Sequence, residues 1–329
     1  ETVEITFSIA VVAAGDDFST GVTINVGSVS YTISSGTPQA DKTKVRYVLA
    51  AGVDGTETVT WAYNGSGNIV GESGSAALAS VSAQTLTNTA FEPHDLTGTS
   101  YWWHARPSYQ NGLSGSDGDA IASWNEDGGS NAFVQSTTSE KPTLKLASNG
   151  INGLAVVRFD GTDDNMSVDP PDFQAMFGAG SAAKTAWFVV TITGMGDTSA
   201  WYSNRTIMTT SAGYWGVAVD NNSIMHGNYD GATDVVEVSA TTSTYVVEVR
   251  HDGTDIFLSL NGGSESDVAS GATDGGGSGA DENSMVIGEN WNDTAFFNGD
   301  IAEIVTSDAN ESSANRTKMR NVLRNIYGV

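Results

Sequence analysis

Three aspartates that lie within five residues of one another, Asp160, Asp163 and Asp164, are the first candidates for chemistry in this chain. Carboxylate oxygens are ligands that Ca²⁺ prefers, and the cluster follows an apolar run that reads as a strand. The spacing is not that of an EF-hand loop, and acidic residues at the end of a hairpin often face only water. We therefore expect Ca²⁺ as a cofactor at this cluster, with a solvated turn as the open alternative.

Aromatic residues beside amides form a second kind of candidate site. An exposed aromatic ring can pack on the face of a sugar while neighbouring amides hydrogen-bond its hydroxyl groups. Trp291 is the best single candidate for such a platform. The full set of predicted ligand-binding residues is Trp291 with Asn290 and Asn292, Tyr229 with Asn228, and Trp215 with Tyr214.

The patterns that would indicate catalysis are missing. A retaining glycosidase needs two carboxylates about 5 Å apart, and Glu265-Ser266-Asp267 in the second half of the chain has no partner glutamate and falls in a Gly- and Ser-rich loop. No Gly-x-Ser-x-Gly elbow joins a strand to a helix. The histidines, which a lyase would place on strands, are expected in a turn, the linker and an aromatic segment, and only His226 could face a groove. The sequence predicts no catalytic residues and a protein that is not an enzyme.

Composition limits the fold and the partners. The chain has 329 residues, 38 of them Gly, and only 16% are charged, which favours strands and loops in two domains. The formal net charge is −25, and the basic cluster Arg316 to Arg324 is confined to one helix. Because nucleic acid needs patches of Lys and Arg to neutralise its phosphates, we expect no nucleic-acid partner. Cysteine is absent, and no apolar run reaches the roughly 18 residues that cross a bilayer, so no membrane insertion is expected.

The first 90 residues read as a series of short alternating strands. The expected strands are Val3 to Phe7, Val22 to Val26, Val29 to Ile33, Val45 to Leu49 and Thr58 to Trp61. We expect a β-sandwich over residues 1–90, a linker over 91–99 that contains Pro93, and a second domain over 100–329.

The second domain has longer strand-like runs and one helix. The expected strands are Ala155 to Phe159, Ala186 to Ile192, Thr206 to Met208, Trp215 to Val219, Tyr245 to Arg250, Ile256 to Leu260, Met285 to Gly288 and Gly299 to Val305. Ser312 and Ser313 can cap a helix whose apolar residues recur every three or four positions up to Gly328. The segment from Gly262 to Asn283 reads as a mobile loop.

Both domains resemble known families. Thr58-Val59-Thr60-Trp61-Ala62-Tyr63-Asn64 and the closing Leu78 to Asn88 resemble a bacterial or phage immunoglobulin-like module. Asn149 to Asp164, Arg250 to Gly262 and Phe297 to Ile304 resemble the laminin-G-like, concanavalin A-like lectin jelly roll. The resemblance implies an all-β chain: an N-terminal immunoglobulin-like β-sandwich and a C-terminal concanavalin A-like jelly roll with one C-terminal helix.

These resemblances lead to a functional prediction. We expect a non-catalytic, extracellular attachment protein on a virion or bacterial cell surface, with carbohydrate binding by the jelly roll. The expected partners are a cell-surface or environmental glycan, other virion or surface proteins through the N-terminal module, and a further copy of the chain in a homo-oligomer. Two alternatives stay open: a glycan-cleaving hydrolase or lyase on the same fold, and a structural decoration module without a ligand.

Overall fold

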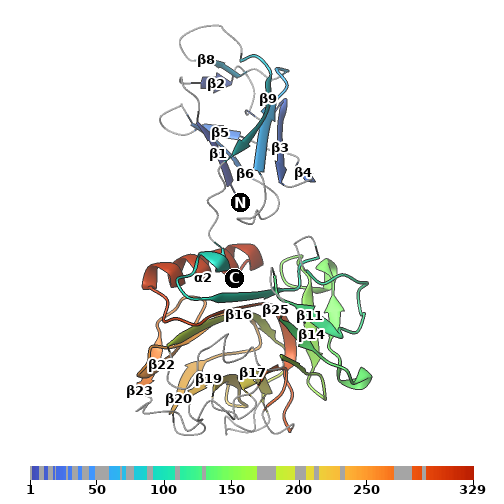
Figure 1. Cartoon of the computed structure of the whole chain (residues 1–329), viewed down its shortest axis with the longest axis vertical. Coiled ribbons are helices and arrows are strands. Elements are labelled where there is room, and N and C mark those ends of the chain that lie inside the picture. Colours follow the sequence, from blue (N-terminus) through green and yellow to red (C-terminus); the bar gives the residue numbers. More distant parts are fainter. Residues whose placement is uncertain are drawn as a thin grey trace. The chain divides into compact units, whose positions relative to one another are not determined.

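In the computed structural model the chain forms two compact units, Glu1–Glu92 and Pro93–Val329 (Figure 1). The residues that it describes are 2–6, 11–13, 18, 20–26, 29–31, 36–38, 44–48, 59–66, 69–71, 78–86, 92–107, 112–127, 131–168, 183–196, 205–210, 215–229, 234–269, 284–290 and 294–329.

The N-terminal unit consists of short antiparallel strands around its own core. One sheet has the order β4-β3-β7-β9, a second β1-β6-β5, and β2 pairs with β8. In β7 the burial alternates, so that Val59, Trp61 and Tyr63 face the core, as expected for a strand with one solvent-facing side. The strands are β1 (Thr2–Thr6), β2 (Val11–Ala13), β3 (Val22–Val26), β4 (Val29–Tyr31), β5 (Gly36–Pro38), β6 (Lys44–Val48), β7 (Val59–Tyr63), β8 (Ile69–Gly71) and β9 (Val81–Leu86).

The C-terminal unit is a sandwich of two eight-stranded antiparallel sheets. The helix-side sheet, named for the helix that covers it, has the order β13-β14-β25-β16-β21-β22-β23, with β10 also paired to β25. Its strands are β10 (Ser100–His104), β13 (Thr143–Lys145), β14 (Val156–Asp160), β16 (Lys184–Ile192), β21 (Thr244–His251), β22 (Asp255–Leu260), β23 (Ser266–Ala269) and β25 (Asn298–Ser307).

The second sheet has the order β11-β12-β15-β24-β17-β18-β19-β20. Its strands are β11 (Ser123–Asn125), β12 (Ala132–Val134), β15 (Met166–Val168), β17 (Arg205–Thr210), β18 (Trp215–Val219), β19 (Ile224–Tyr229), β20 (Asp234–Ser239) and β24 (Met285–Ile287). Three short 3₁₀ helices, Pro93–Asp95, Thr138–Glu140 and Ala147–Asn149, lie between strands. Apolar side chains from both sheets form one continuous core.

The helix α2 (Ser313–Tyr327) covers the outer face of the helix-side sheet (Figure 1). The Ser312 side chain accepts a hydrogen bond from the Asn315 N–H, and Gly328 ends the helix in the left-handed conformation. Arg316 and Arg320 bind the buried carboxylate of Glu248. Because the helix covers this face, β16 is buried on both sides, which accounts for the apolar run from Ala186 to Val190 at its centre.

The structure confirms the all-β class and the C-terminal helix with both of its ends. Within the described residues it also confirms the predicted strands, several of them with ends shifted by one or two residues. Predictions for two histidines and for one loop were wrong. His251, expected in a turn, lies on β21, and His226, which could have faced a groove, is buried on β19. His104 lies in the aromatic segment as expected, on β10.

The loop predicted over Gly262 to Asn283 contains strand β23, and Glu265 just before it pairs with Arg250 and Arg316. The pairing of Glu265 with Arg316 could not be read from a short stretch of sequence, because the two residues are 51 positions apart.

Candidate functional site

A row of polar side chains crosses four neighbouring strands on the outer face of the helix-side sheet. Arg158 of β14 lies opposite Asp300 of β25. On the other side of β25, Asp300 lies opposite Thr191 of β16. Thr191 in turn lies opposite Thr244 of β21. The residues that flank Arg158 in β14, Val157 and Phe159, point into the core, so alternation turns Arg158 outward. Four strands therefore place an ion pair and two hydroxyl groups side by side.

This row lies in a cavity of about 720 Å³, which we call the polar groove. One part of its lining comes from the segment around Asn149 and Asn152, and another from Tyr327 to Val329 at the end of α2. The Asn152 side chain donates a hydrogen bond to the Ile326 carbonyl oxygen at 3.0 Å and so joins these two segments. The volume is within the range of about 300–1,000 Å³ that small-molecule sites occupy.

The ion pair in the groove has a defined geometry. Arg158 donates from Nε and Nη2 to the two carboxylate oxygens of Asp300 at 2.6 and 2.9 Å, and from Nη2 to the Asn149 carbonyl oxygen at 3.1 Å. The hydrogen bonds to Asp300 raise the pKa of Arg158, so the guanidinium stays charged. The Asp300 side chain is 6% exposed and that of Arg158 39%. Arg158 is therefore held at one end of its guanidinium and open at the other.

The groove lining is polar elsewhere too. The Thr191 and Thr244 hydroxyl oxygens lie 2.8 Å apart, and Asn261, Ser243 and Thr193 add further amide and hydroxyl groups. Tyr327 is the aromatic residue among the described lining residues, and it is 1% exposed with its hydroxyl donating to Glu303. A ligand in this groove would therefore be held by hydrogen bonds rather than by stacking on a ring.

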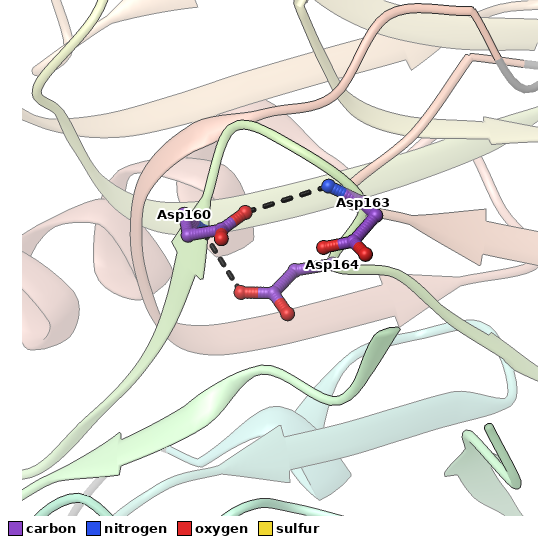
Figure 2. A group of neighbouring side chains, drawn as sticks. All are labelled: Asp160, Asp163 and Asp164. Atoms are coloured by element: carbon purple, nitrogen blue, oxygen red, sulfur yellow. Dashed lines mark hydrogen bonds between the residues drawn. The ribbon is translucent and has the colours of Figure 1, made fainter. Parts of the chain in front are cut away.

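The three aspartates predicted to bind a metal do come together (Figure 2). Asp160 ends β14, and Asp163 and Asp164 follow in the turn towards β15, with one carboxylate oxygen of each residue within 4.8 Å of the others. Asp160 Oδ1 accepts from the Thr162 N–H at 2.7 Å, and Asp164 Oδ2 accepts from the Asp160 N–H at 2.9 Å. Asp160 and Asp164 each keep a second oxygen that the described residues leave without a hydrogen bond.

Burial affects the charge of this cluster. Desolvation, together with the nearby charges of Asp160 and Asp163, raises the pKa of Asp164 to about 6 from its usual 3.8, although the hydrogen bond from the Asp160 N–H acts in the opposite direction. The three carboxylates therefore repel one another at neutral pH, and a divalent cation between them would relieve that repulsion. Carboxylate oxygens are donors that Ca²⁺ takes, and water would have to supply the remaining ligands.

Two of the predicted sugar-binding residues, Trp215 and Asn290, are buried. Trp215 is 1% exposed, because alternation along β18 points it into the core with Val217 and Val219, so it offers no stacking surface. Asn290 is 2% exposed, and its side chain holds a turn by accepting from the N–H groups of Thr294 and Ala295.

The other residues of that set are in β19 or outside the described part of the chain. Asn228 and Tyr229 belong to β19, where they pair with Gly216 and Trp215. Trp291, Asn292 and Tyr214 lie outside the described residues.

The sequence did not single out the residues of the polar groove. Arg158 and Asp300 are 142 positions apart, and no local spacing connects them. One signal was present: each is a charged residue within an apolar strand, in Val156-Val157-Arg158-Phe159 and Gly299-Asp300-Ile301. A charge at an outward position of a strand in a helix-covered sheet needs a partner, which is what the neighbouring strand provides.

No known protein family and no curated protein matches this chain. Solved structures do show a likeness. Trypanosoma rangeli sialidase, in a complex with a difluorinated sugar acid, matches with a TM-score of 0.45 and 13% identity over 69% of this chain and 33% of the sialidase chain. The binding domain of botulinum neurotoxin DC, in complex with rat synaptotagmin II, matches with a TM-score of 0.36 and 11% identity over 58% of this chain and 49% of that chain.

One expectation is corrected by this comparison. The chain was expected not to be an enzyme, but the solved structures to which it is similar include sialidases, which are enzymes. The similarity extends over only about a third of the sialidase chain. The expectation is withdrawn, and turnover of any bound glycan has to be measured directly.

Proposed function

We propose that this chain is a surface attachment protein that binds carbohydrate in the polar groove of its C-terminal unit. The observation that supports this most directly is the row Arg158, Asp300, Thr191 and Thr244 in the floor of a 720 Å³ groove. Sugar hydroxyl groups both donate and accept hydrogen bonds, and this row offers guanidinium donors, carboxylate acceptors and hydroxyl groups within one cavity.

The position of the row also favours a pre-formed site. Its members are held on paired strands, and the Arg158–Asp300 ion pair fixes two of the side chains before a ligand arrives. A rigid set of hydrogen-bonding groups loses little conformational entropy when a ligand binds. The groove would therefore recognise a sugar of defined shape.

The setting of the protein is part of the same proposal. We place it outside the cell, on a virion or bacterial surface, where the N-terminal unit would contact other surface proteins and the C-terminal unit would present the groove. Among the described residues, no helix is long and apolar enough to cross a membrane.

Calcium at the aspartate cluster is a further component of the proposal. The support is the approach of the three carboxylates and the raised pKa of Asp164, both of which a bound cation would compensate. Asp160 also lies on the strand that carries Arg158, so a cation there would stiffen the same edge of the sheet.

The groove is tested by blocking it in the full chain. Ser243 is an exposed residue of the lining, and in Ser243→Tyr the ring would fill space that a sugar needs. We expect binding to a glycan array to fall at least tenfold for every glycan that the wild type binds. The matched control is Ser264→Tyr, which adds the same ring at an exposed serine outside the groove lining.

Product analysis of each bound glycan separates attachment from cleavage. Binding that is lost in Ser243→Tyr and kept in Ser264→Tyr supports the proposal. Absence of glycan binding by the wild type, or equal binding by both variants, overturns the assignment to this groove.

A further inference from the structure

The Arg158–Asp300 pair has hydrogen-bonding capacity left on both partners. Arg158 uses Nε and Nη2 for Asp300 and Asn149, and its Nη1 makes no hydrogen bond to any residue that the structure describes. The side chain is 39% exposed within the groove lining. Each Asp300 oxygen accepts one hydrogen bond from Arg158 and keeps a second lone pair. The pair thus presents donors and acceptors to the same cavity.

The charges around Arg158 do not call for an anionic ligand. Asp300 already neutralises the guanidinium, and the negative charge of Asp117 also raises the pKa of Arg158. Hydrogen bonds from the Leu146 N–H and the Asn149 side chain lower the pKa of Asp117. Lys145 offsets Asp117, so these four groups sum to no net charge. The whole chain carries −25. A ligand carboxylate would meet a compensated arginine in the field of an acidic protein.

We propose that the polar groove selects uncharged sugars, one hydroxyl accepting from Arg158 Nη1 and another donating to Asp300, and discriminates against sugar acids. This rests on the proposed function, because it names the ligand class of the same site. Arg158 is then a specificity-determining residue: it supplies directed N–H donors, which a lysine at this position would not supply in the same geometry.

The experiment compares matched glycan pairs on the full chain. Each pair shares its linkage and differs at C6, where a hydroxymethyl group is replaced by a carboxylate: galactose and galacturonate, glucose and glucuronate, mannose and mannuronate oligomers. We expect the neutral member of at least one pair to bind at least tenfold more tightly than its acid. Its Kd should change less than twofold between low and high salt, since no ion pair forms.

Arg158→Lys tests the role of the guanidinium while keeping the charge. We expect at least a tenfold weaker Kd for the neutral sugar, with the thermal unfolding midpoint measured in parallel to show that the variant is folded. Binding unchanged in a folded Arg158→Lys variant would overturn the assigned role.

Two failures can be told apart. If glycans bind and Ser243→Tyr blocks them, but the acid members bind more tightly or lose affinity with salt, the selectivity is wrong and the groove stands. If the wild type binds no member of any pair, both proposals fall.

Discussion

The aspartate cluster and the polar groove share strand β14, yet they are built in different ways. The cluster comes from one turn of five residues at the end of β14. The groove floor comes from four strands, with Arg158 and Asp300 paired across β14 and β25. A site made by one turn is specified locally, whereas a site made by a sheet depends on every strand that sets its register. Perturbing the sheet should therefore affect the groove far more than the cluster.

The largest expected effect comes from the strand that carries Asp300. A methyl group added at Gly299 would collide with the Thr191 carbonyl oxygen and the Phe297 ring. Gly299→Ala should lower the free energy of unfolding by about 3 kcal/mol, because the packed sheet has no room to relax. Urea denaturation measures this loss. Ser148→Ala, at an exposed position, is the control, and equal stability of the two variants would contradict the packing argument.

The second prediction concerns the binding of Ca²⁺ to the aspartate cluster. If Ca²⁺ binds the three aspartates, a concentration about 100 times its Kd should stabilise the fold by about 2.7 kcal/mol. The measurement is thermal unfolding with Ca²⁺, with Mg²⁺ and with chelator. The Ca²⁺ response should disappear in Asp164→Asn. A response of equal size in that variant would place any calcium site elsewhere.

Asn152 tests the contact between two segments of the groove lining. Its backbone is left-handed, at φ 50°, and its side chain binds the Ile326 carbonyl oxygen. Asn152→Ala should cost about 1.5 kcal/mol, from backbone strain and the lost hydrogen bond, whereas Asn152→Gly removes only the hydrogen bond and should cost less. Thermal unfolding of the two variants separates these contributions. A larger loss in the glycine variant would argue against the strain.

The smallest expected effect is the pH dependence of the cluster without calcium. The raised pKa of Asp164 means that the folded state favours the protonated carboxyl, so the stability that this group contributes is present below pH 3.8 and lost as the pH rises through about 6. Asp164→Asn should therefore be more stable than wild type at pH 7 by about 1 kcal/mol, after screening by solvent. This gain in stability corresponds to a rise in Tm of about 2–4 °C.

The control for this measurement is Asp267→Asn at an exposed position. The advantage of Asp164→Asn should vanish at pH 4. A difference that does not change with pH would show that packing, not charge, causes it.

Strands and the helix were predictable because their signals are local. Alternation in Val22 to Val26 and Trp215 to Val219 gave the bounds of β3 and β18 as the structure has them. The N-cap at Ser312 and the left-handed Gly328 were also readable, since a cap depends on a few adjacent residues. The same alternation did not tell which face of β18 is covered, so Trp215 was placed at a ligand site although it lies in the core.

The sequence by itself therefore determined the all-β class, the C-terminal helix and the proximity of Asp160, Asp163 and Asp164. Only the tertiary structure decided that Arg158 meets Asp300, that Thr191 and Thr244 continue their row, and that Asn290 is committed to a turn. The physical reason is that a strand carries a side-chain period of two residues along its own axis, whereas its neighbours in the sheet are chosen by packing and hydrogen bonding across the whole unit.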